Sequence, residues 1–164
     1  MAFDENRTVT QDDLPVTIRA ARPTDSQAVL RLAAALVPDG EGVDSRRALK
    51  TLLALPDHRV WVAELASAAN PATTRGAVVG WMHAFIARRV GTVPFVEVGG
   101  LVVENARRRG GIGSSLLARA TTWGDALGMP VRVRCREERE DSHAFYLAEG
   151  FSHIKNQRVF EWQR

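Results

Sequence analysis

The amino-acid sequence predicts a mixed α/β fold in a single domain. Segments with the alternation of strands and segments with the apolar spacing of helices follow one another along the chain. Between Phe95 and Leu117, an apolar strand passes through three arginines and three glycines directly into a helix. The length of 164 residues suits one domain of about 150 residues. We therefore expect a loose polar tail over residues 1–14 and one domain over residues 15–164.

The first half of the chain predicts strands and helices in turn. A strand starts at Val16, and Thr24-Asp25 caps a helix whose apolar positions continue to Leu36. A second helix follows Asp44, after a break rich in proline and glycine. Strands are expected over residues 59–65 and 76–88, with a hairpin loop over 67–75.

The second half predicts the elements that would carry the site. The central strand is expected over residues 95–103 and a long helix over 112–127. Residues 131–137 alternate like a strand, a short helix ends at Gly150, and a last strand is expected over 158–162.

The glycine-rich turn before the long helix predicts an anion-binding site. Backbone N–H groups at a helix N-terminus have no partner within the helix, and the helix dipole favours negative charge there. Glycine removes the Cβ that would hold a phosphate away from the backbone. The spacing fits neither a Walker loop nor a dinucleotide fingerprint, but it fits [Q/R]-x-x-G-x-[G/A] through Arg108, Gly111 and Gly113.

With this turn, the chain resembles the GNAT superfamily of N-acetyltransferases. A second motif supports the resemblance, because Phe145-Tyr146 and Gly150-Phe151 match the short-helix pattern A-x-x-F-Y-x-x-x-G-F or a close variant. The resemblance covers about residues 15–162. It implies a GNAT fold, in which helices flank both faces of a central, mostly antiparallel and splayed sheet.

The resemblance also implies the activity and the cosubstrate. We expect a cytoplasmic acyltransferase that transfers acetyl from acetyl-coenzyme A to a primary amine of a small molecule by direct transfer. Asp141-Ser142-His143 before Phe145-Tyr146 is similar to members that acetylate aminoalkylphosphonates and aminoglycosides. Two alternatives stay open: acetylation of a protein N-terminus or lysine, and a non-catalytic module that binds acyl-coenzyme A.

Acetyl transfer needs a neutral amine and a proton for the leaving thiolate. Glu97 is the candidate base, since an acid in a mainly apolar strand is costly unless it is partnered or functional. A salt-bridged glutamate is the structural alternative for Glu97, and Glu104 is the fallback base. The resemblance places Tyr146, the single tyrosine of the chain, as the general acid. A core aromatic is the alternative for Tyr146. Trp81 and His83 are expected to pack within the structure, with a place facing the acceptor cleft as their alternative.

The resemblance implies that the turn holds the pyrophosphate of coenzyme A. The Leu101 N–H would bond the acetyl carbonyl, Val103 would pair with the pantetheine, and Gly99-Gly100 would form the bulge that opens this gap. Arg109-Gly110 reverses the family's usual order, and Ser142 lies in the stretch that replaces a usual asparagine. The expected cofactor-binding residues are Leu101, Val102, Val103, Arg108, Arg109, Gly110, Gly111, Ile112, Gly113, Ser114, Ser142 and Phe145.

Composition argues against other classes of function. The net charge of +3 comes from twenty arginines and two lysines, and the adjacent cluster of arginines lies inside the turn, so nucleic-acid binding is not expected. No apolar run is long enough to span a membrane, and no histidine spacing suggests a metal site. A single cysteine excludes an intrachain disulfide. An exposed last strand would allow a homodimer.

Overall fold

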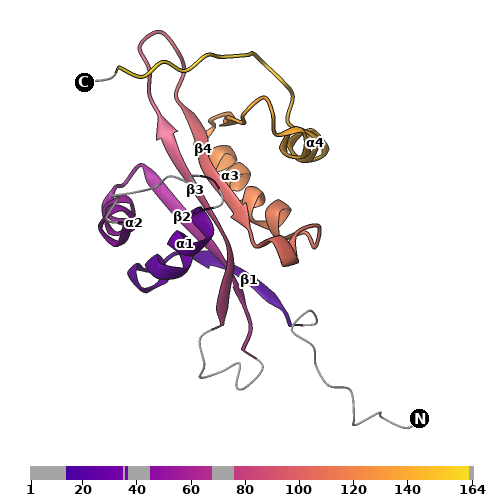
Figure 1. Cartoon of the computed structure of the whole chain (residues 1–164). Coiled ribbons are helices and arrows are strands. Elements are labelled where there is room, and N and C mark those ends of the chain that lie inside the picture. Colours follow the sequence, from indigo (N-terminus) through magenta and orange to yellow (C-terminus); the bar gives the residue numbers. More distant parts are fainter. Residues whose placement is uncertain (1–13, 35, 37–44, 68–75, 163–164) are drawn as a thin grey trace. The chain divides into compact units, whose positions relative to one another are not determined.

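The computed structural model describes residues 14–34, 36, 45–67 and 76–162. The chain divides into two compact units, Met1–Val133 and Arg134–Arg164, which we describe one at a time. The elements in chain order (Figure 1) are β1 Val16–Ala20, the 3₁₀ helix η2 Pro23–Asp25, α1 Ser26–Ala33, α2 Ser45–Ala54, β2 His58–Leu65, β3 Ala77–Ala87, β4 Phe95–Val103, the 3₁₀ helix η3 Asn105–Arg107, α3 Ile112–Leu127, β5 Val131–Val133 and α4 Glu140–Ala148.

The N-terminal unit is built on one five-stranded sheet with the order β1-β2-β3-β4-β5. The first four strands pair antiparallel with their neighbours, and β5 pairs parallel with β4. A parallel partner needs a crossover connection, and α3 provides it. The predicted mixed α/β fold with a mostly antiparallel sheet is confirmed.

Helices cover both faces of this sheet (Figure 1). On one face, buried side chains of α1 and α2 pack with those of the strands in a core that includes Val62, Trp81 and Val102. On the other face lies α3, since a Cβ added at Gly80 would approach Leu116 Cδ1 to 3.4 Å. Side chains alternate between the faces along each strand, so residues 58, 60 and 62 share the face of α1 and α2.

Local interactions set the entry to α1. Asp25 is buried and accepts hydrogen bonds from the Arg22 backbone N–H at 2.7 Å and from the Arg19 guanidinium at 2.7 Å. Arg19 also bonds Glu64 of β2, so this cluster ties the start of the helix to two strands. The predicted helix start at Thr24-Asp25 is confirmed, while the helix itself ends at Ala33, before Leu36.

The C-terminal unit contains α4 and an extended segment. The predicted helix stop is confirmed, because Gly150 follows the C-cap Glu149 with a φ of 85°, which glycine adopts at little cost. The strand predicted over 158–162 is wrong, because the described residues 151–162 form no regular secondary structure. Strand-forming residues make a ladder only when another strand lies beside them. The possible homodimer remains a prediction, and it can no longer rest on an exposed strand over residues 158–162.

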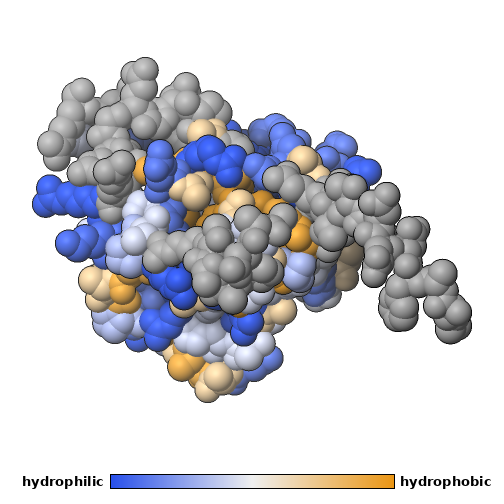
Figure 2. Space-filling view, turned by 90° about the horizontal axis from the view of Figure 1, so that it is seen from below, coloured by the Kyte–Doolittle hydropathy of each residue, from blue (hydrophilic) through white to orange (hydrophobic). Residues whose placement is uncertain are grey.

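The strand predicted over 131–137 is much shorter than expected. Pairing with β4 joins only Val131–Val133 to residues 96–98. Alternation predicts which side chains share a face, but it does not predict how far a neighbouring strand runs alongside. On the face shown in Figure 2, apolar residues gather next to a strip of hydrophilic ones. No helix among the described residues is long and apolar enough to cross a membrane.

Candidate active site

The turn between β4 and α3 has the backbone that an anion site needs. The short helix η3 ends at Arg107, and α3 begins at Ile112 with Gly111 as its N-cap. Gly111 has a φ of 78°, and a Cβ added there would meet no atom within 4 Å. The position therefore requires glycine for its conformation, and the space beside it is open to a ligand.

Arg109 occupies the left-handed conformation, with a φ of 66°. It is the only non-glycine residue with positive φ among the described residues. This conformation costs roughly 1–2 kcal/mol for a residue with a Cβ. The reversed Arg109-Gly110 order thus places an arginine where the backbone favours glycine, and such strain often lies at functional sites.

Arg108 links the turn to the central strand. Its Nε donates a hydrogen bond to the Val103 carbonyl at 3.2 Å, while the residue as a whole is exposed. Gly110 and Gly111 are exposed as well, and Gly113 and Ser114 in the first turn of α3 are half-buried. The backbone N–H groups at the start of this helix therefore lie near the surface.

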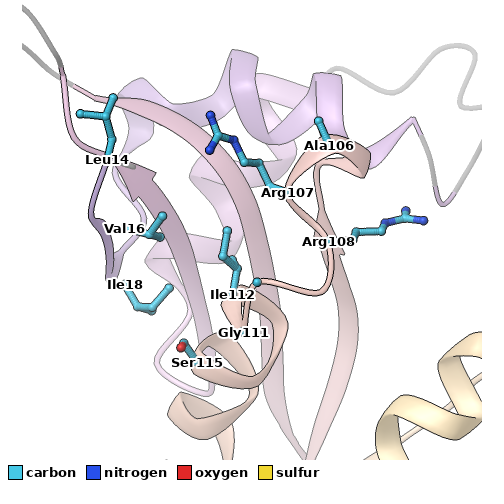
Figure 3. A pocket seen from close by; sticks show the side chains of 10 residues that line it. Leu14, Val16, Ile18, Ala106, Arg107, Arg108, Gly111, Ile112 and Ser115 are labelled. Atoms are coloured by element: carbon cyan, nitrogen blue, oxygen red, sulfur yellow. The ribbon is translucent and has the colours of Figure 1, made fainter. Parts of the chain in front are cut away.

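A cavity of about 470 Å³ borders this turn (Figure 3). In the close-up, Ile112 points towards β1, whereas Arg108 points away from the cavity. The predicted residues in its lining are Arg108, Gly110, Gly111 and Ile112, and the remaining ones are Leu14, Val16, Ile18, Ala106, Arg107 and Ser115. Sequence reasoning missed Leu14, Val16 and Ile18, although their spacing of two predicts a shared strand face.

The central strand contains the predicted bulge. His83 of β3 pairs with Gly100 and Ala84 pairs with Val98, so Gly99 lies in a register shift. Beyond Val98, β4 has no partner on its β5 side among the described residues, because β5 pairs only through Val133. The edge of residues 101–103 that faces away from β3 is therefore where an extended ligand could add as a strand.

Leu101, Val102 and Val103 pair with β3 through Met82, Trp81 and Gly80. Val102 and Val103 are buried, and Leu101 is half-buried. Their side chains are thus part of the structure of the sheet, and only backbone groups could serve a ligand.

Glu97 is buried on β4 and has a cationic partner. Arg89 Nη2 lies 3.3 Å from Glu97 Oε2, with 8% of the Glu97 side chain exposed. Phe85 is its cross-strand partner on β3, and Arg132 is its partner on β5. The salt-bridge alternative for Glu97 is therefore observed, and it leaves a catalytic role open.

Aromatic side chains lie beside Gly99, which is itself exposed. A Cβ added at Gly99 would lie 3.0 Å from His83 Nδ1 and 3.3 Å from Phe85 Cε1. His83 Nε2 in turn lies 2.9 Å from His58 Nδ1 of β2. Sequence reasoning considered His83 for the acceptor cleft but missed His58, since the two histidines are far apart in the sequence and meet only across the sheet.

Tyr146 lies in the C-terminal unit, in the middle of an aromatic cluster. Its ring centroid is 5.1 Å from that of Phe145 and 5.9 Å from that of Phe151, both in edge-on contact. Burial, and then the Cys135 thiol, raise the pKa of Tyr146 to about 12, against an opposing effect of Arg139. The phenol therefore keeps its proton at neutral pH.

The other predicted residues of this unit lie on the same helix. Phe145 and Ser142 are half-buried on α4, and the Ser142 N–H bonds the Arg139 carbonyl at 3.0 Å. His143 Nε2 lies 3.0 Å from the Arg136 carbonyl. Across the described part of the chain, no group of three or more His, Cys, Asp or Glu side chains could hold a metal ion.

Comparison with known proteins gives a family match. Residues 29–151 match the acetyltransferase (GNAT) family, which confirms the predicted resemblance over most of the chain. A search of curated protein sequences gave no match.

Solved structures of aminoglycoside acetyltransferases share the fold. The 6'-N-acetyltransferase AAC(6')-Ih from Acinetobacter baumannii has a TM-score of 0.75 at 19% identity, covering 92% of this chain and 99% of that one. AAC(6')-Iy in complex with the bisubstrate analogue CoA-S-monomethyl-acetylneamine has a TM-score of 0.72 at 22% identity, with coverage of 92% and 99%. The enzyme meta-AAC0020 from an uncultured soil metagenomic sample, in complex with sisomicin, has a TM-score of 0.72 at 17% identity, with coverage of 91% and 96%.

Proposed function

The chain belongs to the acetyltransferase (GNAT) family, with acetyl-coenzyme A as acyl donor, and we propose that it acetylates a primary amine of a small molecule by direct transfer. The observation that carries this proposal is the turn before α3. Its N-cap glycine has positive φ and an open position where a Cβ would lie. Structural neighbours that act on aminoglycosides support the small-molecule class of acceptor.

The residues of the turn fit the phosphates of coenzyme A. The backbone N–H groups of Gly111, Ile112, Gly113 and Ser114 would bind the pyrophosphate at the positive end of the α3 dipole. The guanidinium groups of Arg108 and Arg109 are exposed and would add charge-assisted bonds. The left-handed backbone of Arg109 would then serve binding, because it turns this stretch of the chain around the anion.

The acetyl group would lie beside the bulge of β4. Acetyl-coenzyme A supplies an activated thioester, and the protein must polarise its carbonyl and handle two protons. The Leu101 N–H, just after the bulge, would stabilise the negative charge that develops on the carbonyl oxygen. Val102 and Val103 would offer backbone groups to the pantetheine arm.

Tyr146 would protonate the departing thiolate. A phenol that keeps its proton to about pH 12 is fully available as a donor at neutral pH. Ser142 and Phe145 on the same helix are proposed contacts of coenzyme A. Glu97 is the candidate base by position, with Arg89 as its partner.

The first experiment tests the turn by calorimetric titration of acetyl-coenzyme A and coenzyme A. Gly111→Ala adds a Cβ to a residue whose left-handed backbone conformation favours glycine. Gly91→Ala is the matched control. Gly91 has a φ of 79°, and a Cβ there would also meet no atom within 4 Å. Both variants should lose about 1–2 kcal/mol of stability, because both put a Cβ on a left-handed residue.

Only Gly111→Ala should lose affinity, by more than about tenfold, which equals about 1.4 kcal/mol. Equal binding by both variants would show that the turn is not the cofactor site. A folded wild-type protein that binds neither ligand would sink the acetyltransferase proposal.

The second experiment identifies the acceptor class from thiol release. Primary amines including sisomicin are compared with peptides that carry a free N-terminus or a lysine. Tyr146→Phe should slow the reaction by about 100-fold while acetyl-coenzyme A binding is retained. Turnover only with peptides would replace the small-molecule proposal, and binding without turnover of any amine would favour a non-catalytic module.

A further inference from the structure

We propose that the His58–His83 pair, rather than Glu97, accepts the first proton from the acceptor amine and passes it towards water. This inference rests on the proposed acetyl transfer and names the base of that same site. It starts from the hydrogen bond across β2 and β3, in which His58 Nδ1 lies 2.9 Å from His83 Nε2. At that distance a single hydrogen lies between the two nitrogens.

The pair is held by stacking. The two imidazole rings are nearly parallel at 9°, with centroids 5.1 Å apart. Phe85 stacks on both, at 5.4 Å from His58 and 5.6 Å from His83. A stack of three rings fixes the orientation of the ring nitrogens, and a proton relay needs such fixed geometry.

The second nitrogen of His83 faces the central strand. The nearest atom to a Cβ at Gly99 would be His83 Nδ1, at 3.0 Å. His83 is also the cross-strand partner of Gly100, the residue directly before Leu101. In the tautomer that the relay requires, His83 Nε2 donates to His58 Nδ1, and the lone pair of His83 Nδ1 then lies beside the bulge, where the amine would approach the carbonyl.

Burial on this face keeps His83 neutral and also makes it a weak base, so a proton that it accepts must pass on to His58. Burial, and then His58, lower the pKa of His83 from 6.5 to about 4, so the ring is uncharged at neutral pH. Charged groups on this face include Glu97, the loop residue Arg89 beside it, and Arg132, which lies over the Phe95 ring at 4.2 Å. The Arg19–Asp25–Glu64 cluster at the entry to α1 lies on this face as well. Glu97 already has a cationic partner. Its carboxylate would attract the ammonium group of the acceptor, and the histidines would take the proton from that ammonium group.

Trp81 adds a second indication that this face binds a polar ligand. It lies on β3 two residues before His83 and so shares its face. Its indole Nε1 is buried and has no hydrogen-bond partner among the residues that the structure describes. A buried donor without a partner is rare and needs an explanation, and an acceptor with a hydroxyl or amine would provide one.

The proton moves from the amine to water in three steps. The N–H bond of the bound ammonium breaks, and its electron pair stays on nitrogen as the lone pair that attacks. His83 Nδ1 gains that proton, and the shared hydrogen moves from His83 Nε2 to His58 Nδ1. The proton on His58 Nε2 leaves to water, since the residue is half-buried.

The kinetic test compares His83→Gln, His58→Gln and Glu97→Gln with the wild type, using sisomicin and the best amine of the screen. His83→Gln should lower kcat about 100-fold at neutral pH, while KM for the amine and the Kd for acetyl-coenzyme A change less than about twofold. His58→Gln should lower kcat about tenfold, because His83 can still accept a proton but cannot pass it on. Phe85→Leu is the packing control, because it removes a stacked ring that has no nitrogen and so cannot carry a proton.

A pH profile separates a proton acceptor from a structural residue. The deficit of His83→Gln should shrink to less than about tenfold at alkaline pH, where more of the amine arrives without its extra proton. A deficit that stays constant with pH, or one matched by Phe85→Leu, overturns the proposal. A kcat that falls in Glu97→Gln but in neither histidine variant also overturns the proposal.

Nitrogen NMR of the imidazoles tests the pair without any acceptor. A slowly exchanging imidazole N–H should be present in the wild type and absent from both histidine variants. Its absence from the wild type overturns the relay alone. A wild type that binds acetyl-coenzyme A but acetylates no amine overturns the proposed function, and with it this step.

Discussion

The neutral state of His83 predicts how stability changes with pH. Its pKa is lowered from 6.5 to about 4 in the folded protein, first by burial and then by His58. Above pH 6.5 the ring is neutral in both the folded and the unfolded state, so it adds no pH dependence. As the pH falls from 6.5 towards 4, the unfolded state binds a proton that the folded state does not, and the free energy of unfolding decreases.

The size of this loss follows from the two pKa values. Between about pH 7 and about pH 5, full linkage gives about 2 kcal/mol, at about 1.4 kcal/mol per pKa unit. Because His83 is half-buried rather than fully enclosed, we expect about 1–2 kcal/mol.

Urea unfolding followed by tryptophan fluorescence measures the effect. The quantity of interest is the drop in unfolding free energy from about pH 7 to about pH 5 in the wild type minus the same drop in His83→Gln. Glutamine does not titrate, so any general loss of stability in the variant cancels in this difference. A difference near zero would show that the pKa of His83 in the folded protein stays near its ordinary value of 6.5, so burial would not be what keeps the ring neutral.

Individual contacts and the burial of Tyr146 lead to further expected outcomes. Gly99→Ala should destabilise the protein by about 1–3 kcal/mol, because its Cβ would lie 3.0 Å from an imidazole nitrogen, and urea unfolding measures this. Arg89→Ala should cost about 1–2 kcal/mol, because it removes a partner of the buried Glu97 carboxylate. Arg88→Ala, whose ion pair is exposed, should cost less than about 1 kcal/mol in the same assay, and equal losses would contradict the argument. Tyr146 should ionise near pH 12 in a spectrophotometric titration, and a midpoint near 10, the ordinary value, would show that burial does not protect it.

The sequence predicted the elements around the turn well. The central strand and the long helix have the predicted bounds, Phe95–Val103 and Ile112–Leu127. Both are marked by local signals, because β-branched residues fill the strand and glycines flank the helix at each end. The bulge at Gly99-Gly100 was predicted as well, since two glycines inside a strand are otherwise unfavourable.

Predictions that depended on a distant partner were less accurate. The strand expected over 131–137 pairs over three residues, and the segment 158–162 forms no strand. The closeness of His83 and Phe85 to Gly99 was not predicted, because it depends on the pairing of β3 with β4. The roles of Glu97, Tyr146 and the cofactor-binding residues stay predictions.

The sequence by itself therefore determined the family, the order of the elements and the anion-binding turn, because each depends on residues close together in the chain. Only the tertiary structure decided the pairing of His58 with His83, the ion pair of Glu97 with Arg89, and the left-handed backbone of Arg109. Sheet register sets the first, since cross-strand neighbours depend on how two separate segments align. The second depends on how the loop between β3 and β4 brings Arg89 beside Glu97. The third depends on how the chain must turn to enter α3, which residue type alone does not reveal.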